Sequence, residues 1–193
     1  MARPREFEVD QALRDAAEVF RAKGYHAASL DDLTEGTGLA KGSLYKAFHD
    51  KKTLFLEALD VYARDSRARF EETLNAPGSP LQAIRGTLVG YIERMRTVSG
   101  TAGCLVTNTA VEVGTQDAEI ASHVRDSFRR RIALFEAAVK RAQAAGEIDA
   151  AKDARTLAEF LELTVQGIRV GVKSAPDEAP LLRAVEVALS ALS

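Results

Sequence analysis

The sequence predicts an all-α protein with a small N-terminal domain and a larger C-terminal domain. Apolar residues recur at helical spacing along nearly all of the 193 residues, and no segment alternates at the two-residue period of a strand. Glycine and proline interrupt this pattern at intervals typical of short connections between helices. One expected helix of about 25 residues would span roughly 37 Å, which is long enough to belong to both domains.

The first third of the chain predicts three helices that precede this long one. Apolar residues keep helical spacing up to Phe20, and Gly24 stands where a helix is expected to end. Ser29 with Asp32 three residues later indicates a capping box that begins a short second helix, and a turn at Gly38 leads to the third. The expected helices are residues 8–22, 30–37, 41–48, 51–75, 80–98, 105–113, 117–145, 153–174 and 180–192.

Charge and composition narrow the class of protein. The formal net charge is −2, and residues 1–55 hold nine basic and nine acidic side chains, so DNA binding has to depend on where the basic residues lie. No apolar run reaches the roughly 18 residues of a membrane span, and no secretory signal is visible, so we expect a cytoplasmic protein. The single cysteine excludes an internal disulfide and a multi-cysteine metal site.

Two short helices joined by a glycine-containing turn, after a packing helix, form the pattern of a helix-turn-helix. A helical hairpin with no role in DNA binding would have the same small apolar core. That core is expected to contain Phe20, Leu30, Leu33, Leu39, Leu44 and Phe48. Lys41 begins the third helix, and Lys51 and Lys52 begin the fourth, where cations oppose the helix dipole. Phosphate would explain this placement, because helix-start amides and lysines can converge on one anion.

The residues around Lys41 suit a close approach to DNA. Gly42 and Ser43 are small, and the Ser43 hydroxyl can donate a hydrogen bond; Tyr45 combines an aromatic ring with a polar tip. The predicted DNA-binding residues are Ser29, Lys41, Gly42, Ser43, Tyr45, Lys46, Lys51 and Lys52. We assign residues 1–52 to this helix-turn-helix domain and residues 53–193 to a ligand-binding and dimerisation domain.

The stretches from Gly24 to Leu33 and from Gly38 to Phe55 resemble the TetR/AcrR family of repressors. The similarity covers about residues 8–60. It implies about nine helices, a homodimer, and release from DNA when a ligand binds. It also implies that residues 41–46 enter the major groove while Tyr45 and Lys52 hold phosphates. Ala47 stands where many members carry a histidine, so any phosphate contact from that position is missing.

The last two helices are expected to carry the subunit interface, because residues 153–174 are apolar on more than one face. One face would cover the domain itself and the other a second subunit, as the family resemblance also implies. The predicted dimerisation residues are Leu161, Ile168, Gly171, Val185 and Leu189. A two-fold protein reads two-fold DNA, so the expected operator is an inverted repeat.

An effector cavity is expected among the helices between residues 55 and 172. Few charges fall on the inward faces of these helices, which favours a small and mostly apolar effector. The candidate ligand-binding residues are Tyr62, Tyr91, Met95, Cys104, Asn108, Phe128, Ile132, Phe160 and Thr164, with Phe70 and Phe135 as further lining candidates. No cofactor is expected.

Cys104 leaves open the alternative that the repressor is switched by oxidation or modification of a thiol instead of by a reversibly bound effector. It stands near the start of a helix, where the dipole favours a thiolate, and a redox- or electrophile-sensing repressor would use such a thiol; a small buried residue is the other interpretation. Glu119 and His123 lie one turn apart but lack a third ligand, so no metal site is expected, and Glu112 is interpreted as a surface or capping acid.

Together these features predict a ligand-responsive transcriptional repressor without enzymatic activity, whose partners are operator DNA, a small effector and a second copy. A thiol-dependent enzyme built on Cys104 would leave the lysines at the helix starts unexplained. A helical architectural protein that binds DNA without an effector is a third hypothesis, and an effector cavity would count against it.

Overall fold

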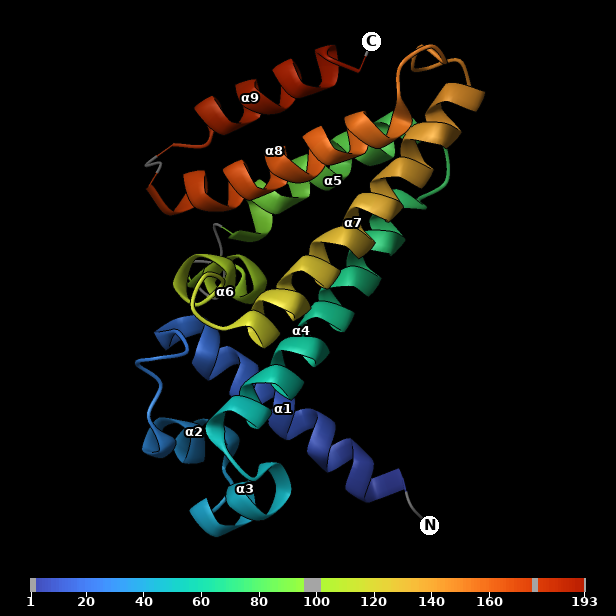
Figure 1. Ribbon diagram of the computed structural model, residues 1–193. Coiled ribbons are helices and arrows are strands. Elements are labelled where there is room, and N and C mark those ends of the chain that lie inside the picture. Colours follow the sequence, from blue (N-terminus) through green and yellow to red (C-terminus); the bar gives the residue numbers. More distant parts are fainter. Residues whose placement is uncertain (1–2, 96–101, 175–176, 193) are drawn as a thin grey trace. The chain divides into compact units, whose positions relative to one another are not determined.

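The structure is a computed structural model that describes residues 3–95, 102–174 and 177–192, and Figure 1 traces the chain. Over these residues the chain forms nine α-helices and no strand, which confirms the predicted all-α fold class. The helices are α1 (Arg3–Lys23), α2 (Leu30–Thr37), α3 (Lys41–Phe48), α4 (Lys51–Leu74), α5 (Pro80–Met95), α6 (Leu105–Glu112), α7 (Ala118–Ala144), α8 (Ala154–Ser174) and α9 (Ala179–Ser190). Within this described part, none of the helices is both long and apolar enough to span a membrane.

Local signals in the sequence set most helix boundaries. The amide of Asp32 donates to the hydroxyl of Ser29 at 3.1 Å, and the amide of Ser29 donates to the Asp32 carboxylate at 2.9 Å, so α2 begins with the expected capping box. Helix α1 begins at Arg3, five residues earlier than predicted, because Pro4 is tolerated in a first turn and the charged residues that follow propagate helices well. The predicted end of the fifth helix at residue 98 lies outside the described residues.

The chain divides into two compact units. Unit 1 consists of residues 1–66 and 104–125 and contains α1, α2, α3 and α6, with the first parts of α4 and α7. At its centre the rings of Phe20 and Phe55 meet edge to face, with centroids 4.9 Å apart. A Cβ on Gly36 would lie 2.3 Å from Cγ2 of Val19, so glycine is needed for α2 to pack closely on α1. The two short helices contribute the buried residues Leu33, Leu44 and Phe48.

Unit 2 consists of residues 67–103 and 126–193 and contains α5, α8 and α9 with the remaining parts of α4 and α7. Helix α5 packs against α8 and α9, and the rings of Phe70 and Phe135 meet edge to face at 4.8 Å in the core. Residues 53–66 and 104–125 therefore belong to the unit that holds the helix-turn-helix. The boundary between functional domains at residue 52 stays a prediction.

Candidate nucleic-acid interface

Helix α3 presents a polar face to solvent and an apolar face to the core of unit 1. Leu44 and Phe48, one turn apart, are buried. All other side chains of the helix are exposed, and Tyr45 retains 50% of its accessible surface. The exposed residues are Lys41, Gly42, Ser43, Tyr45, Lys46 and Ala47. The structure thus brings five of the predicted DNA-binding residues onto one short helix.

The N-terminus of α3 has the features of an anion site. Its N-cap residue, Ala40, makes no side-chain hydrogen bond to the helix, and the first turn carries no acidic residue. The first amides of an α-helix have no acceptor within the helix, so they remain oriented toward the end of the helix where positive potential collects. Gly42 has nothing within 4 Å of the position a Cβ would take, so a phosphate could approach the backbone here.

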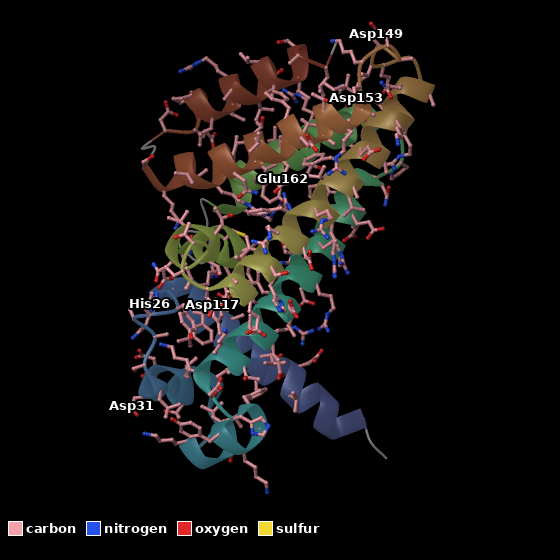
Figure 2. All side chains as sticks on the ribbon, viewed as in Figure 1. His26, Asp31, Asp117, Asp149, Asp153 and Glu162 are labelled. Carbon is pink, nitrogen blue, oxygen red and sulfur yellow. The ribbon has the colours of Figure 1, made fainter. Side chains whose placement is uncertain are left out.

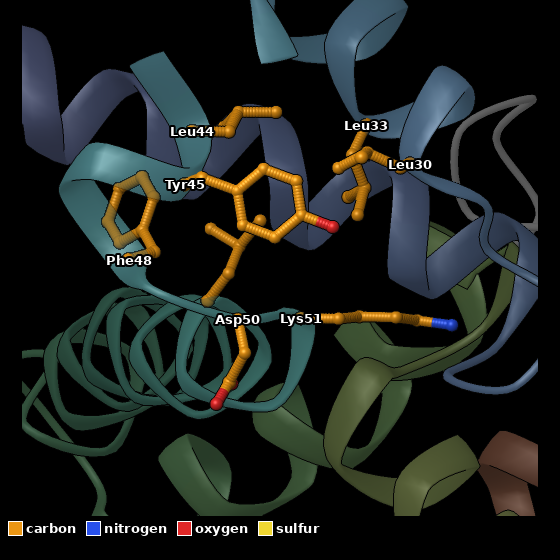
Figure 3. A pocket seen from close by; sticks show the side chains of 8 residues that line it. Leu30, Leu33, Leu44, Tyr45, Phe48, Asp50 and Lys51 are labelled. Atoms are coloured by element: carbon orange, nitrogen blue, oxygen red, sulfur yellow. The ribbon is translucent and has the colours of Figure 1, made fainter. Parts of the chain in front are cut away.

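Behind α3 lies an apolar pocket of about 130 Å³. Figure 3 shows the ring of Tyr45 between Leu44 and Phe48 on one side and Leu30 and Leu33 on the other. The remaining lining residues are Leu54, Asp50 and Lys51. Of the predicted small core, Phe20, Leu33, Leu44 and Phe48 are buried and Leu30 lines the pocket, whereas Leu39 is only half-buried. The core leaves space beside the ring of Tyr45.

The lysines at the start of α4 are engaged within unit 1. Nζ of Lys51 donates to the carbonyl oxygen of His26 at 3.2 Å and lies 5.0 Å from the centroid of the Tyr25 ring. Nζ of Lys52 lies 2.7 Å from a carboxylate oxygen of Asp117 and 2.9 Å from one of Glu119. These two carboxylates raise the pKa of Lys52.

The phosphate role implied for Lys52 by the family resemblance stays a prediction, because its ammonium would have to leave two ion pairs. Ser29, another predicted DNA-binding residue, is exposed but caps α2. Its hydroxyl oxygen accepts the Asp32 amide and retains its own proton as a donor.

Glu112, at the end of α6, is a functional candidate that the sequence interpretation missed. Its carboxylate accepts the backbone amides of Tyr25 at 2.9 Å and of His26 at 2.8 Å, in the loop that leads into α2 (Figure 2 labels His26). Gly24 in the same loop has φ +85°, and a Cβ there would lie 2.7 Å from the carboxylate, so only glycine fits.

The expectation that Glu112 is a surface or capping acid is therefore wrong. A sequence signal existed: a carboxylate in the last turn of a helix opposes the helix dipole, so its position calls for a partner elsewhere. Asn108, a predicted ligand-binding residue on the same helix, donates from Nδ2 to the carbonyl oxygen of Arg21 at 3.3 Å. Helix α6 therefore makes hydrogen bonds through Asn108 to the end of α1 and through Glu112 to the loop that follows it.

The structure divides the other predicted effector residues between the two units. Tyr62, Cys104 and Asn108 belong to unit 1, whereas Tyr91, Phe128, Ile132, Phe160 and Thr164 belong to unit 2. Cys104 is the N-cap of α6 and only 6% exposed. The side chain of Met95 lies outside the described residues. Phe160 is 39% exposed, so its placement on an inward face was wrong.

Unit 2 contains a buried charged cluster that the sequence interpretation did not anticipate. Nε of Arg131 donates to both carboxylate oxygens of Glu162 at 3.0 and 3.1 Å, and another guanidinium nitrogen donates to the Tyr91 hydroxyl at 2.7 Å. Arg169 is also buried, with its guanidinium 4.9 Å from the centroid of the Tyr91 ring. The expectation of few charges on inward faces was therefore wrong, because α7 and α8 turn these long side chains into the core.

The predicted dimerisation residues lie mostly inside the protomer. Leu161, Ile168 and Val185 are at most 3% exposed and belong to the core of unit 2, so their assignment to a subunit interface is corrected. A Cβ on Gly171 would lie 2.8 Å from Cδ2 of Leu181, so this glycine serves the packing of α9 on α8. Leu189 packs against the same core. The large apolar residues that are exposed on the described parts of these two helices are Phe160, Leu163, Val170 and Val187.

The chain matches two protein-family models. Residues 12–58 match the model for bacterial regulatory proteins of the tetR family, and residues 80–188 match the model for the tetracyclin repressor-like C-terminal domain. The chain is 32% identical over 193 residues to the uncharacterized HTH-type transcriptional regulator YezE of Bacillus subtilis, covering all of both chains. It is 30% identical over 187 residues to the HTH-type transcriptional repressor ComR of Escherichia coli, covering 96% of this chain and 88% of that protein.

A solved structure of similar fold contains DNA. It is a cysteine mutant of the TetR family transcriptional regulator CifR complexed with 26-base-pair double-strand operator DNA. The similarity has a TM-score of 0.86 at 31% sequence identity and covers 99% of this chain and 100% of that chain.

Proposed function

We propose that this chain, which belongs to the TetR family of bacterial transcriptional regulators, represses transcription by binding operator DNA and leaves the DNA when a small molecule binds. The observation that carries the proposal is the exposed face of α3, where cations and hydroxyls surround an uncapped helix N-terminus. The relatives support it, because ComR is a repressor and the CifR mutant is complexed with operator DNA.

In this proposal α3 enters the major groove. Lys41 and the first amides of α3 bind a phosphate, Tyr45 contacts a second phosphate at the groove edge, and Ser43 and Lys46 face base edges. Lys51 and Ser29 support the docking from the flanking helix ends. Lys52 joins the contact only by exchanging Asp117 and Glu119 for a phosphate.

The proposed homodimer forms through the outer faces of α8 and α9, on the side opposite the core. Leu163, Gly167 and Val170 continue from Phe160 at spacings of three and four residues, and Leu163 and Val170 are 71% and 56% exposed. Nothing lies within 4 Å of the position a Cβ on Gly167 would take, so a helix of a second copy can approach closely here. On α9 the exposed Val187 extends the apolar surface.

The test combines DNA selection with stoichiometry. Genomic fragments bound by the purified protein are sequenced, and the mass of the complex on the recovered site is measured by light scattering. We expect an inverted repeat occupied by two copies or a multiple of two. A Leu163→Asp/Val170→Asp variant is expected to be monomeric and to lose operator binding, whereas Val111→Asp, at an exposed position on α6, is the matched control. Recovery of no enriched sequence would contradict the proposal.

Switching through Cys104 is the alternative route of release. Burial of Cys104 is the usual setting of a packing cysteine, which favours reversible binding of an effector instead. A Cys104→Ser variant separates the two routes, because it should keep its response to a reversibly bound effector. Loss of a response to oxidant or electrophile in this variant would favour the thiol switch.

A further inference from the structure

The ammonium of Lys52 lies between two carboxylates, one just before α7 and one in its first turn. Nζ of Lys52 is 2.7 Å from Oδ2 of Asp117 and 2.9 Å from Oε2 of Glu119 (Figure 2 labels Asp117). All three residues belong to unit 1. One positive charge therefore meets two negative charges, at a helix start where DNA, itself negative, is proposed to dock.

This cluster is close in the chain to the proposed DNA-contacting helix, and solvent reaches it. Lys52 is the second residue of α4 and follows Phe48, the last residue of α3, by four positions. The side chain of Lys52 is 36% exposed, and those of Asp117 and Glu119 are 28% and 60% exposed. Exposed ion pairs are weak and screened by salt, so the ammonium can exchange these carboxylates for another anion.

The two carboxylates differ in what else they do. Oδ1 of Asp117 accepts two backbone amides in the first turn of α7, at 3.0 and 3.1 Å, so this residue caps α7 and also pairs with Lys52. Among the described residues, Lys52 is the one cation that the Glu119 carboxylate meets. The start of α4 is capped by Asp50, whose carboxylate accepts the Thr53 amide at 2.7 Å. Glu119 therefore acts on Lys52 through its charge.

From this arrangement we infer that Asp117 and Glu119 are an internal competitor for DNA phosphate, which restrains Lys52 and lowers the affinity for the operator. A phosphate that approaches Lys52 meets two carboxylates of its own sign, so the contact forms only when the ammonium turns away from them. Such an autoinhibitory contact keeps the affinity below its maximum, which makes release from the operator easier. The inference rests on the proposed function, because it concerns how strongly the same surface binds DNA.

The experiment replaces each carboxylate by the amide of the same shape. Glu119→Gln should raise operator affinity by about two- to fivefold, as expected when one exposed ion pair no longer competes. Asp117→Asn/Glu119→Gln should raise it by about tenfold and steepen its salt dependence, because Lys52 then takes full part in the phosphate contact. Asparagine caps helices about as well as aspartate, so α7 keeps its cap. Fluorescence anisotropy with labelled operator over a range of salt concentrations measures both quantities.

A double-mutant cycle separates this competition from a general loss of negative charge. In a Lys52→Gln background the gain from Glu119→Gln should largely disappear, because no ammonium is left to release. Glu57→Gln makes the same change in net charge at an exposed position on α4 and should leave the affinity nearly unchanged. A purely structural role predicts a lower melting temperature for Glu119→Gln and no gain in affinity. That result, or an equal gain with and without Lys52, would overturn the inference.

A duplex of unrelated sequence keeps this test distinct from operator recognition. Phosphate contacts do not depend on sequence, so the carboxylate variants should show a gain of the same direction on such a duplex at low salt. If the wild type binds neither duplex, the proposed function and this inference both fail. If the wild type binds DNA and the carboxylate variants bind no tighter, the inference alone fails.

Discussion

The two short helices α2 and α3 have the same length of eight residues, yet their N-termini differ in kind. Helix α2 begins with a complete capping box and two acidic residues, Asp31 and Asp32, in its first turn. Helix α3 begins with Ala40, which supplies no cap, and with Lys41. The N-terminal amides of α2 find acceptors in its own capping box, whereas at the start of α3 the Ser43 amide donates to the Ala40 carbonyl oxygen and no side chain caps the helix, which leaves its positive end open to another molecule. This difference is what we expect if α2 serves to position α3 and α3 is the helix that binds DNA.

The largest effect is expected from reversing the charge at the start of α3. Lys41→Glu removes a cation and places an anion at the proposed phosphate site, so operator affinity should fall by about 100-fold or more, from the usual loss of a contact plus repulsion. Fluorescence anisotropy with labelled operator measures it. Lys140→Glu makes the same change in net charge on α7 and should have little effect. Equal losses in both variants would mean that only overall charge matters.

The next largest effect concerns the anchor of the loop before α2. Glu112→Ala leaves the amides of Tyr25 and His26 without their carboxylate, and the free energy of unfolding should fall by about 2 kcal/mol, the range for hydrogen bonds to a charged group. Urea denaturation measures this change. Glu72→Ala, at an exposed position on α4, is the matched control. A loss of unfolding free energy no larger than that of the control would mean that the loop before α2 keeps its conformation without the Glu112 carboxylate.

A smaller but more telling change makes the start of α3 resemble that of α2. Ala40 already has the extended backbone of an N-cap, with φ −64° and ψ 148°. Ala40→Asp should therefore raise the free energy of unfolding by about 1 kcal/mol while it lowers operator affinity, because its carboxylate occupies the proposed phosphate site. Ser29→Ala should lower stability by about the same amount. If Ala40→Asp raised both stability and affinity, α3 would not meet a phosphate at that end.

The smallest effect is a pH dependence at the start of α2. The ammonium of Lys23, 2.6 Å away, and the hydrogen bonds from Ser29 lower the pKa of Asp32 from 3.8 to about 2. A lowered pKa in the folded state stabilises the protein above about pH 4, and this contribution disappears as the pH falls through 2. The stability difference between wild type and Asp32→Asn should therefore shrink between pH 4 and pH 2. A constant difference would show that the charge of Asp32 contributes nothing.

The sequence predicted helices better than it predicted side-chain partners. The capping box at Ser29 and the helix ends near Gly24 and Gly38 depend on residues a few positions apart, so a local sequence pattern is enough to predict them. Glu112 lies 87 and 86 residues from Tyr25 and His26, whose amides it accepts, and Lys52 meets the carboxylates of Asp117, just before α7, and Glu119, in its first turn. Such pairings depend on tertiary packing, which no local pattern encodes.

Unit 2 shows the same limit more strongly. Periodicity places Leu161 and Ile168 on an apolar stripe but does not say whether that stripe faces the core or a second subunit, and here it faces the core. Few charges were expected on the inward faces of these helices, because isolated buried charges are unfavourable. Only the fold shows that Arg131 meets Glu162 and Tyr91 in the core of unit 2.

The most direct test of the central role of α3 is operator binding by a Lys41→Ala/Tyr45→Ala variant compared with wild type. Both substituted side chains are exposed, so the variant is expected to keep its helical circular dichroism and its melting temperature. The wild type should bind the recovered inverted repeat in a salt-dependent manner, and the variant should lose that binding. A folded variant that binds the operator as tightly as wild type would contradict the assignment of α3 as the helix that contacts DNA.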